Sequence, residues 1–172
     1  MKYFAYGSNI DEADLKEWCQ QKGHAFPFMK FLEPVLLEGF KLTFNYYSSL
    51  RSGGAANLMP DINSVTYGLL FEVEDKDMEI LREKESYPNY YNEIPVTVKS
   101  FKNAFFPAIT YKVDKSKETS AHQEPTKYYL NLLISNAQKY GFPNNYTTFL
   151  RNIEAKGIRI NAPPRLRKTR NH

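Results

Sequence analysis

Alternation of apolar and polar residues is the clearest pattern along the chain. It is strongest over 65–73, where every second residue is a valine, tyrosine, leucine or phenylalanine, as in a half-buried strand. The same reasoning, with one short aromatic run at the N-terminus, predicts strands over 3–6, 35–45, 65–73, 94–98 and 109–113. A stretch of small and then apolar residues, 53–59, is expected to stop at Pro60.

Apolar residues at helical spacing predict helices between these strands. The predicted helices cover 11–21, 75–84, 125–140 and 144–155. Gly23 suits the C-terminal cap of the first of them, and Pro125 suits the first position of the third. Strands and helices alternate irregularly, which favours an α/β chain of the α+β type: a mixed sheet or small β-barrel packed by helices.

Length and composition indicate one domain with a substantial core. The chain has 172 residues, of which 15% are aromatic, enough apolar area to argue against disorder. We expect the domain to cover 1–157 and a basic C-terminal tail to cover 158–172. Six of the 23 basic residues fall after position 155, so the rest of the chain carries 17 basic against 19 acidic residues.

That charge distribution limits the expected partners. No basic stripe with interleaved aromatics appears outside the tail, so we do not expect nucleic acid as a partner. No apolar run is long enough for a signal peptide or a membrane span, and a cytoplasmic location is therefore the default expectation. The sequence leaves the oligomeric state open.

The turn Gly7-Ser8-Asn9 joins the first predicted strand to the first predicted helix. Such a turn leaves several backbone N–H groups unpaired and pointing one way, which suits an anion or an oxyanion. The alternative is an ordinary turn in which Ser8, Asn9 or Asp11 only caps the helix.

Protein nucleophiles and metal ligands have little support. Cys19 is the one cysteine and shares an apolar helix face with Trp18, so burial is its expected role. The three histidines, His24, His122 and His172, form no known catalytic or zinc-binding pattern. We expect neither a metal nor a cofactor.

Glu85 is the candidate general base. By composition alone it belongs to a solvated helix face, together with Glu83. It stands, however, where the helix should end, beside the aromatic pair Tyr90-Tyr91, and aromatic walls raise the pKa of a carboxylate.

Five ordered motifs between about Tyr3 and Ile153 resemble the γ-glutamylcyclotransferase-like (AIG2-like) family. They are Tyr3-Phe4-Ala5-Tyr6-Gly7-Ser8-Asn9, the strand from Gly39, Gly53-Gly54-Ala55-Ala56-Asn57, the strand from Tyr67, and Leu81 to Pro88 followed by Tyr91. Pro125, Tyr128 and Gly141-Phe142-Pro143 resemble the family's C-terminal helix pair. Two positions depart from the pattern: Ser86 stands where the family usually has Gly, and Arg82 replaces the usual Asp.

The resemblance implies an enzyme that cyclises a γ-glutamyl amide. The substrate's own α-amine attacks its γ-carbonyl, releasing 5-oxoproline and a free amino acid or amine, with Glu85 as the general acid and base. Substrate-binding roles are implied for Tyr6, Gly7, Ser8, Asn9, Gly54, Ala55, Tyr91 and Tyr128, which should converge with Glu85 on one cavity. The tyrosines have packing as their alternative role.

Two alternative functions stay open from the sequence. A cyclotransferase specific for an isopeptide or a biosynthetic γ-glutamyl conjugate is one. A binding or regulatory member of the fold that no longer turns over is the other, although an intact Glu85 argues against it.

Overall fold

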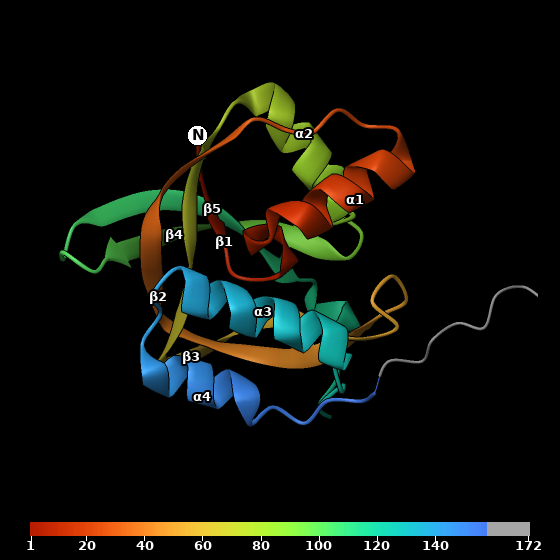
Figure 1. Cartoon of the computed structure of the whole chain (residues 1–172), viewed down its shortest axis with the longest axis vertical. Helices are drawn as coiled ribbons and strands as arrows, with labels where there is room; N and C mark the ends of the chain where they lie inside the picture. Colours follow the sequence, from red (N-terminus) through yellow and green to blue (C-terminus); the bar gives the residue numbers. More distant parts are fainter. Residues whose placement is uncertain (158–172) are drawn as a thin grey trace, which may run out of the picture.

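The chain folds around a closed five-stranded barrel (Figure 1). The computed structural model describes residues 1–157, and the predicted basic tail, 158–172, lies outside the described residues. The strands follow the order β1-β3-β2-β4-β5 around the barrel. They are β1 (Lys2–Ala5), β2 (Met29–Ser48), β3 (Gly53–Val73), β4 (Tyr91–Ser100) and β5 (Phe105–Val113).

Strand β1 makes the sheet mixed. Tyr3 is opposite Phe71 of antiparallel β3 on one side and opposite Ile109 of parallel β5 on the other. Strand β1 is hydrogen-bonded to a neighbouring strand on each side, and most of its residues are buried. An unbroken run of aromatic and apolar residues fits this position, because both faces of the strand are covered. The predicted α+β barrel and the central position of this strand are confirmed.

Strands β2 and β3 form one long hairpin. Gly39, at φ 78°, lies where the pairing register shifts, as expected of a bulge. The expected stop at Pro60 is wrong, because β3 continues through it to Val73. Pro60 is opposite Phe40, directly beside the bulge, where the ladder is already interrupted and a missing N–H costs little.

Helices cover the barrel on two sides (Figure 1). Their bounds are α1 (Glu12–Lys22), α2 (Asp75–Lys84), α3 (Lys127–Lys139) and α4 (Asn144–Arg151), and short 3-10 helices cover Ser8–Ile10 and Lys115–Lys117. Asp11 caps α1 by accepting from the N–H of Asp14, and Gly23 ends it in the left-handed conformation. Helix α3 begins two residues later than Pro125, the predicted first position, and Thr126 caps it through its hydroxyl.

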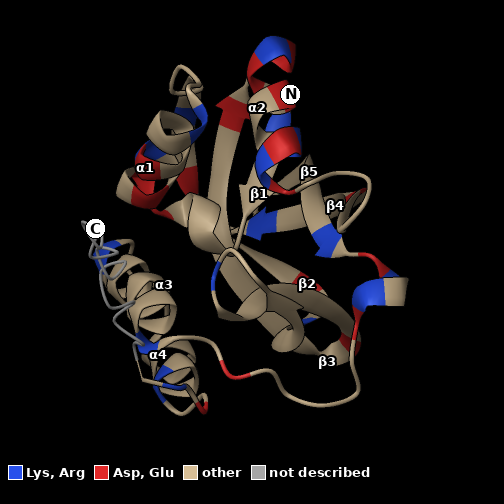
Figure 2. Cartoon of the chain, turned by 90° about the vertical axis from the view of Figure 1, so that its right-hand side faces the viewer, with Lys and Arg blue, Asp and Glu red and all other residues tan. Residues whose placement is uncertain are grey.

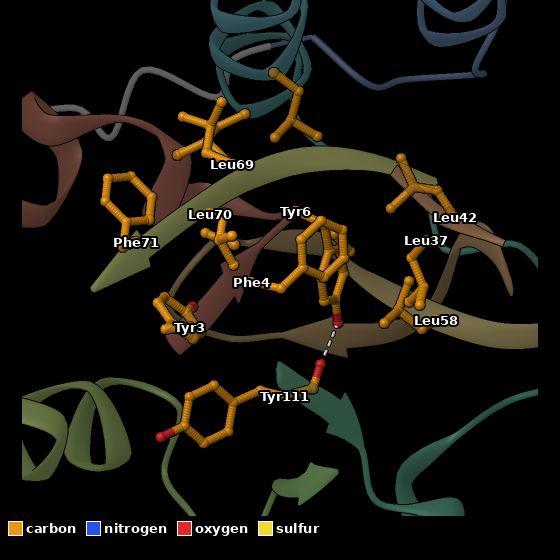
Figure 3. Close-up of a cluster of buried hydrophobic side chains, with 14 of the residues drawn as sticks. Tyr3, Phe4, Tyr6, Leu37, Leu42, Leu58, Leu69, Leu70, Phe71 and Tyr111 are labelled. Carbon is orange, nitrogen blue, oxygen red and sulfur yellow. Dashed lines mark hydrogen bonds between the residues drawn. The ribbon is translucent and has the colours of Figure 1, made fainter. Parts of the chain in front are cut away.

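Large apolar side chains fill the barrel and the space between the barrel and the helices (Figure 3). Phe4, Leu58, Leu69 and Leu70 are completely buried, and each such side chain contributes about 1.5–3 kcal/mol by leaving water. The hydroxyl of Tyr6 donates a hydrogen bond of 2.6 Å to the carbonyl of Tyr111, which satisfies a polar group inside this core.

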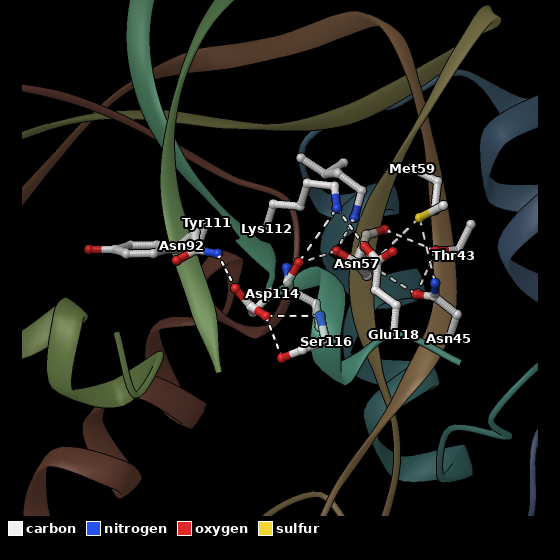
Figure 4. Close-up of polar contacts among 12 residues, drawn as sticks. Thr43, Asn45, Asn57, Met59, Asn92, Tyr111, Lys112, Asp114, Ser116 and Glu118 are labelled. Carbon is white, nitrogen blue, oxygen red and sulfur yellow. Dashed lines mark hydrogen bonds and ion pairs between the residues drawn. The ribbon is translucent and has the colours of Figure 1, made fainter. Parts of the chain in front are cut away.

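A buried polar cluster fixes the position of β3 relative to β2 and β5 (Figure 4). The Asn57 side-chain amide donates to Asn45 (2.9 Å) and Glu118 (3.1 Å). Its oxygen accepts from the backbone N–H groups of Leu58 (2.8 Å) and Val113 (2.9 Å). This cluster ties β3 to β2, to β5 and to the segment that follows β5, so the neighbouring backbone is fixed.

Acidic and basic residues are interspersed on α1 and α2 (Figure 2). No helix within residues 1–157 combines the length and the apolar character that crossing a membrane would require.

Candidate active site

A cavity of about 70 Å³ lies at one end of the barrel, where strands and helices meet. Its wall is formed by β1 and the turn after it, the hairpin end of β2 and β3, the C-terminus of α2, the buried side of α3, and one tyrosine each from β4 and β5. Its wall combines charged, amide and phenol groups, including Asn9, Arg51, Lys84, Glu85, Tyr91 and Tyr129. A small cavity with several charged and hydrogen-bonding groups in its wall suits a small, charged ligand.

Glu85 stands at the C-terminal cap of α2. Its Oε1 accepts a hydrogen bond of 2.8 Å from Nδ2 of Asn9. Burial raises the pKa of the Glu85 carboxyl group, and this outweighs the lowering effects of the Lys84 and Arg51 cations and of the Asn9 donor. A carboxyl group with a raised pKa both accepts and returns a proton more readily near neutral pH.

The turn after β1 faces the same cavity. Ser8 and Asn9 begin the 3-10 helix, whose first hydrogen bond runs from the N–H of Ile10 to the carbonyl of Gly7. The N–H groups of Ser8 and Asn9 therefore have no backbone partner within residues 1–157. A Cβ at Gly7 would lie 3.3 Å from the Tyr129 hydroxyl, so glycine keeps this part of the cavity open.

Asn9 connects the turn to the base. Its Nδ2 donates to the Tyr3 hydroxyl (2.9 Å) as well as to Glu85. Its Oδ1 is buried and has no hydrogen-bond partner among the described residues. The amide thus holds the carboxylate in one orientation from the opposite wall.

A buried ion cluster lies beside Glu85. Arg51 binds both carboxylate oxygens of Asp14, at 2.5 and 2.6 Å. Lys84 donates to Asp14 (3.3 Å) and to the Ser8 hydroxyl (3.1 Å). The cluster joins α1, the β2–β3 hairpin end and α2, because each contributes one charged residue.

Two tyrosines hold the backbone of β3 at the cavity. Tyr91 donates to the carbonyl of Ala56 (3.2 Å), and the Ala56 N–H donates to the Tyr129 hydroxyl (3.4 Å). Burial raises the pKa of Tyr91 well above its usual value and that of Tyr129 to about 12. Both are therefore neutral phenols at physiological pH.

Most of the residues singled out in the sequence line this cavity. They are Tyr6, Gly7, Ser8, Asn9, Ala55, Glu85 and Tyr91. Gly54 does not line it. A Cβ there would lie 1.9 Å from the carbonyl oxygen of Gln123, so this glycine admits the segment before α3.

The expectation for Tyr128 is corrected by the structure. Its side chain is 54% exposed, whereas its neighbour Tyr129 is 3% exposed and lines the cavity. Successive residues of a helix point about 100° apart, so only one of the pair can face the barrel. From the sequence, the tyrosine pair at the start of this helix indicates that one tyrosine lines the cavity. The sequence does not indicate which of the two it is.

Sequence reasoning missed the ion cluster of Asp14, Arg51 and Lys84. Each residue lies in a polar stretch that also suits a solvated surface, and 37 residues separate Asp14 from Arg51. Within residues 1–157, no three His, Cys, Asp or Glu side chains gather closely enough to hold a metal ion.

Comparison with solved structures defines the class of fold. The chain matches a gamma-glutamyl cyclotransferase with a TM-score of 0.75 at 24% identity, covering 90% of this chain and 88% of the other. An uncharacterized protein from Homo sapiens matches with a TM-score of 0.74 at 23% identity and the same coverage. A yeast γ-glutamyl cyclotransferase specific to glutathione matches at 0.60 and 14% identity, covering 87% and 93%. The fold is therefore that of the γ-glutamyl cyclotransferases.

The family follows from the sequence itself. The model of the AIG2-like family matches residues 65–150, half of the chain. The chain belongs to the AIG2-like family. No curated protein matches the sequence.

Proposed function

We propose that this protein is a γ-glutamyl cyclotransferase, which converts a γ-glutamyl amide into 5-oxoproline and a free amino acid or amine. The observation that carries the proposal is the placement of Glu85. Its carboxyl group, with a raised pKa, lines the same cavity as a turn whose Ser8 and Asn9 N–H groups have no backbone partner within residues 1–157. A base and an anion cradle within one small cavity suit a reaction in which a proton moves and negative charge develops.

The cavity's groups suit the two halves of this reaction. The substrate's α-nitrogen attacks its γ-carbonyl carbon, a C–N bond forms and the amide C–N bond breaks. In going from ammonium to lactam N–H, the α-nitrogen gives up two protons, and the departing nitrogen takes up two to leave as an ammonium. Glu85 carries them one at a time, and no water is consumed.

The turn after β1 contributes electrostatically. When the γ-carbonyl becomes tetrahedral, its oxygen gains negative charge, and the N–H groups of Ser8 and Asn9 can donate to it without rearrangement. Tyr91 and Tyr129 hold Ala56 at the opposite wall, which restricts the substrate to a folded geometry. The nucleophile belongs to the substrate, so no protein nucleophile is required.

The test is 5-oxoproline release from a panel of γ-glutamyl compounds: γ-glutamyl amino acids, γ-glutamyl amines, the ε-lysine isopeptide and glutathione. Glu85→Gln keeps the shape and an acceptor for Asn9 but cannot carry a proton, so turnover should fall about 10²–10⁴-fold. Cys19→Ser is the matched control, because Cys19 is buried in α1 and does not line the cavity.

Each outcome has a distinct meaning. Release from the isopeptide alone would select the more specific cyclotransferase. Binding without release from any compound would favour a non-catalytic member of the fold. Full turnover by Glu85→Gln, or loss of turnover in a folded Cys19→Ser, would contradict the mechanism.

A further inference from the structure

Lys84 is a buried cation that the cyclisation chemistry does not use. Its side chain is 3% exposed, yet it lines the cavity beside Glu85. Burying an ammonium is costly unless its donors and its charge are matched. The structure must therefore provide that match, or a ligand must complete it.

The described residues match Lys84 only in part. An ammonium group has three N–H donors, and two of them bind the Ser8 hydroxyl and Asp14. The third has no partner within residues 1–157. The bond to Asp14, at 3.3 Å, is also longer than either bond from Arg51 to the same carboxylate.

Neither nearby carboxyl group takes this third donor. Asp14 lies between two cations, and Arg51 already binds both of its oxygens. Glu85 makes its hydrogen bond with Asn9, and within residues 1–157 no ion pair joins it to Lys84. One donor of a buried cation at the cavity wall is thus available to an anion.

We propose that Lys84, supported by Arg51, binds a carboxylate of the ligand and makes the cavity selective for ligands with an α-carboxylate. The identity of that ligand as a γ-glutamyl compound rests on the proposed function. Lys84 and Glu85 both line the cavity, so the carboxylate and the ammonium of one α-amino acid group fit two neighbouring points of its wall. This fixes the direction in which the ligand enters.

The test compares two lactams that differ only in the carboxylate: 5-oxoproline and 2-pyrrolidinone. Calorimetric titration of the full chain should show that wild type binds 5-oxoproline on the order of ten- to a hundredfold more tightly, the range of one charge-assisted hydrogen bond. In Lys84→Met the preference should fall to near one, with 2-pyrrolidinone affinity unchanged. Lys76→Met, on the exposed N-terminal turn of the same helix, should keep the wild-type preference.

Equal affinity of wild type for the two lactams, or no binding of 5-oxoproline, would overturn the proposal. So would a folded Lys84→Met that keeps the preference. If Lys84→Met does not fold, NMR of the lysine ε-methylene groups in wild type replaces it. One buried lysine should shift with 5-oxoproline and not with 2-pyrrolidinone, and the absence of that shift would refute the assignment.

The binding test is independent of turnover. Selective 5-oxoproline binding without release from any γ-glutamyl compound would refute the proposed function alone. Conversely, equal turnover of a γ-glutamyl amide and of 4-aminobutanamide, which cyclises to 2-pyrrolidinone, would refute the role of Lys84 alone.

Discussion

Asn9 and Glu85 are 76 residues apart in the chain and are joined by a hydrogen bond of 2.8 Å. The bond runs from Nδ2 of Asn9, in the turn after β1, to the carboxylate at the end of α2. It fixes the candidate base against the N–H groups that would hold the substrate, so the two halves of the site cannot move independently. Several expected outcomes depend on this contact and its neighbours.

Asn9→Leu should move the titration of Glu85 to higher pH. The Asn9 donor stabilises the ionised carboxylate of Glu85. Burial already raises the pKa of this group, and loss of the donor should raise that pKa further. Because the ionised form acts as the base, the acid limb of the kcat/KM profile should shift upward. The carboxyl ¹³C resonance of Glu85 reports the same shift without turnover. Asn63→Leu, in an exposed part of the chain, serves as the control, and unchanged titration in Asn9→Leu would contradict the assignment.

Glu85→Gln should stabilise the fold at neutral pH. A carboxyl group whose folded-state pKa is raised contributes full stability below its unfolded-state pKa, and that contribution is lost as pH rises through the folded-state pKa. The neutral amide does not incur this loss. Urea denaturation at several pH values should therefore show equal free energies of unfolding for wild type and Glu85→Gln near pH 4, close to the usual Glu pKa of about 4.3. As the pH rises, the variant should become increasingly more stable than wild type. The exposed Glu17→Gln should show no such divergence.

Asp14→Asn should lower the free energy of unfolding by about 3 kcal/mol, because it leaves Arg51 and Lys84 facing each other in a buried cluster. Glu12→Gln, on the same helix, removes an exposed pair with Lys16 and should change stability little. Chemical denaturation of both variants measures the contrast. Equal stabilities would show that the cluster is solvated and contributes nothing.

Tyr129→Phe should weaken kcat/KM on the order of tenfold, while Tyr128→Phe should leave it unchanged. The Tyr129 hydroxyl accepts from the buried Ala56 N–H at the cavity wall, whereas Tyr128 is exposed. Steady-state kinetics of the two neighbouring variants compare the same chemical change on opposite sides of one helix. The reverse order of effects would place the site on the other face of α3.

Ser86→Gly should stabilise the protein by about 0.5–1 kcal/mol. Ser86 has a φ of 51°, a left-handed conformation that costs a side-chain-bearing residue more than glycine. This conformation gives a physical reason for the glycine that the family pattern has at this position. Ser120→Gly, in an exposed loop without a positive φ, should instead lose stability. In urea denaturation, the midpoint of Ser86→Gly should be higher than that of wild type and the midpoint of Ser120→Gly lower. A lower midpoint for Ser86→Gly would contradict the prediction.

Local sequence signals predicted most elements well. The bounds of α2 agree with the predicted 75–84, since its apolar spacing and its acidic start are local features. The continuation of β3 through Pro60 was missed, because it depends on a bulge in the partner strand. Strand ends are set by pairing, which no short window of sequence contains.

Some residues of the candidate site were likewise predictable from local sequence, and others were not. Motifs of consecutive residues brought out Glu85 and the Gly7-Ser8-Asn9 turn, since backbone geometry and residue type there are encoded locally. The choice of Tyr129 over Tyr128 depended on the rotation of α3 against the barrel. The role of Gly54 depended on the close approach of Gln123.

The sequence by itself determined an aromatic-rich α+β chain, a strand–turn–helix suited to anions, and a carboxyl group at a helix end. Only the tertiary structure decided that the turn and the carboxyl group share a cavity, and that Asp14, Arg51 and Lys84 form its charged wall. The physical reason is that a buried charge is stable only beside its partner. That partner is selected by packing across the whole domain, not by its neighbours in the chain.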